Sequence, residues 1–158
     1  MEAQCEPDRL YRLVSDLTDY PRWMLLTHRV ETDVRGTDGL AAWNVELRAR
    51  VGPFARSKRL RMVRTVHDGA ARRVRFERVE IDGRRHSAWV LNACVVSAPD
   101  ASQPGTSQNG ADQHDSRLEM ELHYGGALWT GGVMERVLAE QILAGRERLL
   151  SLVSQPTD

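Results

Sequence analysis

Hydrophobic residues recur at helical spacing at both ends of the chain and alternate with polar residues in between. From Pro7 to Leu17 the apolar side chains lie three or four residues apart, which predicts an amphipathic helix. A second stripe of this kind predicts a long C-terminal helix from Gly132 to Val153. Tyr20-Pro21 is expected to end the first helix, because proline disfavours a helical conformation in the residue before it.

Five or six strands are predicted between these helices. The clearest is Ala41–Val51, where every second residue is apolar, as in a strand with one buried and one solvated face. Most connections are tight turns, which favours antiparallel pairing, and strands and helices do not alternate as a parallel doubly wound sheet requires. The predicted fold class is therefore α+β, a curved antiparallel sheet wrapped around a long C-terminal helix. The other predicted strands are Thr27–Arg35, Lys58–His67, Val74–Ile81, Ser87–Val96 and Arg117–Tyr124.

The segment Ala98–Ser116 interrupts the alternation. It holds no large hydrophobic residue and is rich in Ser, Gln, Asn, Asp, Gly and Pro, so burial cannot offset the entropy lost on ordering it. We expect a mobile loop there. The chain has 158 residues, 41% of them hydrophobic, which suffices for the core of one domain spanning residues 1–158.

Charge is balanced over the chain and uneven along it. Twenty-two basic and twenty-two acidic residues give no net charge, so nucleic acid is not an expected partner. From Arg48 to Arg85, however, there are thirteen basic and four acidic residues, most at outward strand positions. A solvated sheet face is the simpler interpretation. The alternative is a positive face that docks an acidic protein or makes transient contact with an anionic membrane surface.

The remaining composition excludes several classes of site. No apolar run reaches the roughly 18 residues of a membrane span, and no signal-peptide pattern opens the chain, so a cytoplasmic location is expected. Cys5 and Cys94 are isolated and are expected to be reduced thiols. The five histidines lack the paired spacing of metal ligands, so we expect neither a metal nor a cofactor. No catalytic residue is assigned, and nothing in the pattern sets the oligomeric state.

The opening of the chain carries a family resemblance. Pro7–Leu17, followed by Tyr20-Pro21-Arg22-Trp23, resembles the start of the polyketide cyclase/dehydrase and START-like proteins, the Bet v 1-like superfamily. The order of strands and the closing helix extend the resemblance over nearly the whole chain, and it implies the helix-grip fold. Those proteins usually have a full strand before the first helix, whereas only Met1–Glu6 precede it here. The superfamily includes lipid carriers, aromatase/cyclases, quinone-binding chaperones and ring-hydroxylase subunits, so no single function follows.

A cavity between the sheet and the last helix is the candidate site. Gln141 and Gly145 fall inside the apolar stripe of that helix, where a packed core favours Leu or Ala. Either both face a ligand, in which case Gly145→Leu abolishes binding and leaves the fold intact, or Gly145 lets a strand approach closely and Gln141 bonds to backbone. The residues expected to line the cavity are Trp43, Leu47, Met62, Arg64, Phe76, Asn92, Met120, Tyr124, Leu138, Gln141, Ile142 and Gly145.

Several of these residues have a second interpretation. An inward Arg64 requires an acidic partner or an anionic ligand group, whereas a one-residue bulge would place it in solvent. Asn92 and Tyr124 suit a cavity wall and a packed core equally well. Trp43 is the tryptophan favoured for the cavity, because its strand alternates cleanly.

Three functional hypotheses follow. Binding of a hydrophobic or aromatic small molecule, such as a lipid, quinone or polyketide, is favoured, because no set of residues demands a particular chemistry. If the resemblance to the polyketide cyclases extends to activity, the cavity would hold a poly-ketone chain in a folded pose, and Arg64 or Tyr124 would polarise a carbonyl during ring closure. The third hypothesis is an interaction module with a filled core that docks a partner through the positive sheet face.

Overall fold

The computed structural model describes residues 1–34, 39–51, 54–97, 115–125 and 133–155, with their side chains except at 49–51, 54–56 and 133–139. The strands are β1 (Glu2–Gln4), β2 (Thr27–Asp33), β3 (Ala42–Val51), β4 (Phe54–Asp68), β5 (Arg73–Arg78), β6 (Trp89–Ser97) and β7 (Asp115–Tyr124). The helices are α1 (Pro7–Ser15), the 3-10 helix η1 (Leu17–Asp19), α2 (Tyr20–Trp23) and α3 (Val133–Ser154).

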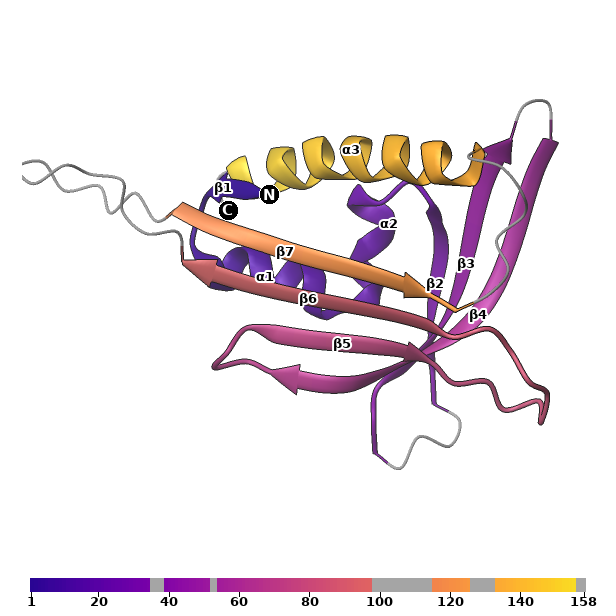
Figure 1. Cartoon of the computed structure of the whole chain (residues 1–158). Coiled ribbons are helices and arrows are strands. Elements are labelled where there is room, and N and C mark those ends of the chain that lie inside the picture. Colours follow the sequence, from indigo (N-terminus) through magenta and orange to yellow (C-terminus); the bar gives the residue numbers. More distant parts are fainter. Residues whose placement is uncertain (35–38, 52–53, 98–114, 126–132, 156–158) are drawn as a thin grey trace, which may run out of the picture.

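The described strands form one antiparallel sheet in the order β1-β7-β6-β5-β4-β3-β2. Figure 1 shows α3 extending from beside β1 towards the end of β3, and it contacts both strands. The helix α1 packs on β5, β6 and β7, whereas α2 lies between β2 and α3. These positions confirm the predicted α+β class, an antiparallel sheet that curves around a long C-terminal helix.

The first helix ends earlier than predicted. Asp16 leaves the helical conformation with φ −130° and ψ 125°, and its carboxylate accepts a hydrogen bond from the Thr18 N–H at 2.8 Å. The chain then turns helical again, so Tyr20-Pro21 opens α2 and does not stop α1. A proline is tolerated there because the N–H groups of the first helical turn have no intrahelical partner.

The strand before α1 is present but short. Ala3 of β1 stands opposite Ser116 of β7, and the Ser116 hydroxyl donates to the Ala3 carbonyl at 3.3 Å. Ser116 is fully buried and belongs to β7, so the loop predicted for residues 98–116 includes the start of a strand. Residues 98–114 of that loop lie outside the described residues.

Aromatic rings fill the part of the core that α1 and α2 cover. Phe76 is completely buried and meets Trp43 edge-on, with ring centroids 5.6 Å apart and planes at 74°. Tyr20 packs against Phe76 at 6.3 Å and against Trp23 at 4.5 Å. The Tyr20 hydroxyl donates to the Val14 carbonyl at 3.0 Å, so the buried phenol keeps a hydrogen-bond partner. This cluster closes one end of the space above the sheet.

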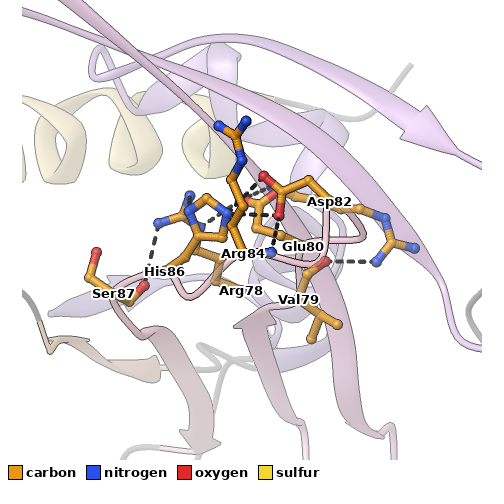
Figure 2. A network of polar contacts seen from close by, with 8 residues as sticks. Arg78, Val79, Glu80, Asp82, Arg84, His86 and Ser87 are labelled. Carbon is orange, nitrogen blue, oxygen red and sulfur yellow. Dashed lines mark hydrogen bonds and ion pairs between the residues drawn. The ribbon is translucent and has the colours of Figure 1, made fainter.

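Part of the basic run after Arg48 is neutralised by acidic neighbours. Figure 2 shows a polar network around the turn that follows β5, in which Arg78 donates to Glu80 at 2.6 Å and contacts His86 Nδ1 at 3.1 Å. The other ring nitrogen of His86 lies 2.9 Å from the Asp82 carboxylate. These pairs offset some of the positive charge predicted for the outer sheet face.

A buried ion pair lies beside this network. Arg61 Nε is 2.7 Å from Asp33 Oδ2, and the two side chains are 3% and 2% exposed. Arg61 also donates from its guanidinium to the Val79 carbonyl at 2.9 Å. Arg61 is thus held in place on the face of β4 opposite to its inward residues Leu60 and Met62.

Within the described residues, no helix combines the length and the apolar character that a membrane crossing needs.

Candidate ligand cavity

An apolar pocket of about 500 Å³ lies between the inner sheet face and the helices α2 and α3. Such a volume lies in the range of small-molecule sites, which are mostly lined by hydrophobic side chains with a few polar groups. Of the residues predicted to line a cavity, the pocket wall includes Leu47, Met62, Met120, Gln141 and Ile142.

Alternate residues of β3, β4, β6 and β7 supply most of the sheet side of the wall, and β5 supplies none of it. Leu47 comes from β3, Met62 from β4, Leu91 from β6 and Met120 from β7. Because side chains of a strand alternate between the two faces, these positions follow directly from the inward phase of each strand. The other strand residues lining the pocket are Thr27, Val45, Leu60, Trp89, Leu118 and Leu122.

The helix α3 supplies the opposite side. Leu149 is buried at 1% exposure, whereas Ile142 and Leu143 are 61% and 60% exposed although they line the pocket. Large apolar side chains with this exposure mark the open side of the pocket, since a filled core would cover them. Gln141 is partly buried on the wall and has no hydrogen bond to a described residue, so the predicted alternative of a backbone bond is not observed there.

Three predicted residues face the same side of the sheet but lie outside the pocket. Trp43 is 3% exposed and packs on Phe76, and neither residue lines the wall. Arg64 lies two residues beyond Met62 on β4, and its guanidinium donates to the Ser15 carbonyl at 2.8 Å. These three residues belong to the filled end of the core under α1 and α2. They point to the inner side of the sheet as predicted, but they do not line the pocket.

Arg64 corresponds to neither of its two predicted environments. The pairing of β4 with β5 does contain a bulge between Arg64 and Val66, yet the Arg64 side chain is partly buried. Its guanidinium carbon lies 5.6 Å from the Trp43 ring centroid, and its donated hydrogen bond reaches Ser15, the last residue of α1. A cation at a helix C-terminus is favourable because carbonyl groups there lack intrahelical partners. Arg64 thus binds protein groups.

Gly145 is buried against α2. A Cβ atom built on Gly145 would lie 3.4 Å from the Trp23 carbonyl oxygen and 3.9 Å from the Met24 Cα. The close approach predicted as the alternative therefore involves α2, where a strand was expected, and Gly145 is not part of the pocket wall.

The last three predicted residues divide differently. Asn92 alternates to the outer sheet face, because the inward residues of β6 are Trp89, Leu91 and Ala93. Tyr124 is inward and borders the pocket through Trp89, with ring centroids 4.9 Å apart. The side chain of Leu138 lies outside the described residues.

The polar groups of Tyr20 and Trp23, at the α2 end of the pocket, both donate to backbone carbonyls of α1. Trp23 Nε1 donates to the Leu13 carbonyl at 3.3 Å, and the Tyr20 hydroxyl donates to Val14. Burial, with a smaller contribution from the Asp16 carboxylate, raises the pKa of Tyr20 well above its ordinary value. Tyr20 is therefore a neutral donor whose proton is already used, and this end of the pocket offers no general base.

Lys58 lies near the pocket and was not among the residues predicted from the sequence. Lys58 lies on the inward face of β4, and its Nζ is 5.1 Å from the ring centroids of both Trp89 and Tyr124. The sequence could have predicted its inward direction, because Lys58 precedes the inward residue Leu60 by two positions in the same strand. Among the described residues no group of three or more His, Cys, Asp or Glu side chains is placed to hold a metal ion.

Comparisons with known proteins agree with this architecture. Residues 4–146 match the family model described as polyketide cyclase/dehydrase and lipid transport. No curated protein matches the sequence. The ZhuI aromatase/cyclase from Streptomyces sp. R1128 is 13% identical with a TM-score of 0.63, covering 98% of this chain and 90% of its own. A START superfamily protein from Mycobacterium smegmatis is 16% identical with a TM-score of 0.59, covering 99% and 95%.

A third solved structure, Ara h 8.0201, is 11% identical with a TM-score of 0.54 and covers 98% of this chain and 95% of its own. At these identities the structural matches establish the fold alone. The family match spans most of the sequence, and the curved sheet around α3 agrees with it. The chain therefore belongs to the polyketide cyclase/dehydrase and lipid transport family and has the helix-grip fold of the START-like, Bet v 1-like proteins.

Proposed function

We propose that the protein binds a hydrophobic or aromatic small molecule in the pocket between the sheet and α3. The observation that carries this proposal is the pocket itself, about 500 Å³ in volume and walled mainly by Leu, Ile, Val, Met and aromatic side chains. Removing apolar ligand surface from water is favourable in proportion to the area buried, so such a wall selects for apolar molecules.

The arginine that was hypothesised to polarise a carbonyl gives a reason to favour binding over turnover. A cyclase mechanism needs a polar group that faces the substrate and is free to polarise a carbonyl. Arg64 lies outside the pocket, donates to the Ser15 carbonyl and has its guanidinium carbon 5.6 Å from the Trp43 ring centroid, and the Tyr20 hydroxyl donates to the Val14 carbonyl. Ring closure remains the second candidate, supported by the family and by the aromatase/cyclase among the similar structures.

Direct analysis of the purified protein tests the proposal. Mass spectrometry of its organic extract, compared with a mock purification, should reveal a stoichiometric lipid, quinone or polyketide. A protein emptied during purification should still bind the neutral fluorophore N-phenyl-1-naphthylamine with saturation at one site. A clean extract together with no saturable binding would reject the proposal in favour of a filled core.

A pair of variants on one strand locates the bound probe. Leu91 lines the pocket from β6, whereas Val96 lies on the opposite face of the same strand and is 40% exposed. Leu91→Trp should weaken probe binding about tenfold by filling part of the pocket, which corresponds to 1.4 kcal/mol. Val96→Trp adds the same side chain outside the pocket and should leave binding unchanged. Equal effects of the two variants would place the probe elsewhere.

A further inference from the structure

The only lysine of the chain lies beside one end of the pocket, next to the wall residue Trp89 but not itself on the wall. Among 22 basic residues, 21 are arginine and one is Lys58. On β4 Lys58 pairs across to Leu47 and precedes Leu60 by two residues, and both of these residues line the pocket. The Lys58 side chain is therefore on the ligand side of the sheet, at the end remote from Arg64.

Two aromatic rings hold the Lys58 ammonium group there. Its Nζ is 5.1 Å from the Trp89 centroid and 5.1 Å from the Tyr124 centroid, within the distance of a cation–π contact. The two rings meet edge to face at 65°, opposite each other in the pairing of β6 with β7. Ring faces attract the cation but accept none of its N–H groups as a carboxylate would, so the ammonium keeps donors to offer.

The cluster contains a second donor without an acceptor. Trp89 lines the pocket with its ring, whereas its Nε1 is covered by protein and has no hydrogen-bond partner among the described residues. Buried N–H groups without a partner are rare in folded proteins. Lys58 likewise makes no ion pair with a carboxylate in the part of the chain that the structure describes, and its strand neighbour Arg59 binds Glu46 on the outer face.

We propose that Lys58, held between the rings of Trp89 and Tyr124, recognises an anionic oxygen, so that the natural ligand is an apolar acid whose carboxylate or enolate lies at this end of the pocket. This inference rests on the proposed binding function and adds the polarity of the ligand to it. An ammonium group only donates hydrogen bonds and carries positive charge, so the matching ligand group accepts hydrogen bonds and carries negative charge.

Two arginines near the pocket are less suited to this role. Arg64 is occupied by the Ser15 carbonyl and the Trp43 ring. Arg146 lines the pocket from α3 but is exposed, and water and salt weaken the attraction of an exposed charge for a ligand. Lys58 is partly buried beside two rings, where a charge interacts more strongly than in bulk water.

A matched pair of fluorescent ligands tests the charge preference. 1-Pyrenebutanoate and its primary amide share one hydrocarbon and differ in charge, and both are titrated against wild type, Lys58→Met and Lys58→Arg. Lys58→Met should weaken binding of the carboxylate about tenfold and change binding of the amide less than about twofold. Lys58→Arg keeps the positive charge and should retain the wild-type affinity for the carboxylate. Arg59→Met removes one positive charge from the outer face of the same strand and should leave the affinity for both ligands unchanged.

Labelling of the wild-type protein provides a second readout that needs no variant. Because the chain has one lysine, acetylation of Lys58 can be followed by mass spectrometry of a single peptide. The carboxylate should protect Lys58 in a saturable way, and the amide should not. Equal loss of both ligands in Lys58→Met, or equal protection by both, would overturn the proposal while the pocket function stands. Failure of wild type to bind either ligand would overturn both.

Discussion

Gly145 separates a packing role from a cavity role in one pair of variants. Its virtual Cβ lies 3.4 Å from the Trp23 carbonyl oxygen and 3.8 Å from the Trp23 ring, both ordinary contact distances. Gly145→Ala therefore fits without displacement and gains helix propensity of up to about 1 kcal/mol. Gly145→Leu adds three further carbon atoms directed at α2, where backbone blocks them.

The expected difference between the two variants follows from this geometry. Forcing extra carbon atoms into a packed contact typically costs about 1–3 kcal/mol, so Gly145→Leu should be less stable than Gly145→Ala by that amount. Urea unfolding followed by far-ultraviolet circular dichroism gives both free energies of unfolding. Tryptophan fluorescence reports on the same contact, because the leucine introduced on α3 would displace the Trp23 side chain.

One result would refute this reasoning. If Gly145→Leu were as stable as Gly145→Ala but no longer bound N-phenyl-1-naphthylamine, the leucine would occupy open space, and Gly145 would face the ligand as the sequence first suggested. Gly145→Ala serves as the matched control, because it removes the flexibility of glycine without reaching across to α2.

Three further predictions concern the rest of the fold. Asp33→Ala should lower the free energy of unfolding in urea by about 3–5 kcal/mol by removing the carboxylate 2.7 Å from the buried Arg61 guanidinium, and the double variant Asp33→Leu/Arg61→Met should recover most of it. Because burial raises the pKa of Tyr20 above 10.0, its contribution to stability is complete below that pH and is lost as the unfolded chain ionises above it, so Tyr20→Phe should reduce the alkaline loss. The backbone N–H of Arg84 donates to the Asp82 carboxylate and lowers its pKa. If the carbon-13 NMR shift of the Asp82 carboxyl carbon titrated with a midpoint at or above 3.8, that hydrogen bond would be contradicted.

Strand phase was predictable where alternation is regular. In Ala41–Val51 the apolar residues are separated by polar ones, so the inward face could be identified without a structure, and Leu47 does line the pocket. In Ser87–Val96 the residues are almost continuously apolar, so the sequence does not show which of them face inward, and Asn92 was assigned to the wrong face.

The sequence of a strand did not predict whether an inward residue lies in the filled core or on the pocket wall. Trp43 and Leu47 share a face of β3, yet Trp43 lies in the filled core and Leu47 on the pocket, because α2 and α1 stop part of the way along the sheet. That boundary depends on contacts between residues far apart in the sequence. Lys58 was not among the residues predicted for the site, although it lies on the same face of β4 as Leu60 and Met62.

The pairing of β1 with β7 constrains the order in which the chain can fold. Ala3 stands opposite Ser116, so β1 has no strand partner until β7, more than a hundred residues further along the chain, has been synthesised. Strands β2 to β6 can pair with their sequence neighbours as they emerge, whereas this contact closes a loop of more than a hundred residues. Contacts of such separation slow folding. Folding intermediates of this protein should therefore contain the β2–β6 meander with β1 unpaired, and amide hydrogens of Glu2–Gln4 should be protected from exchange only in the last kinetic phase.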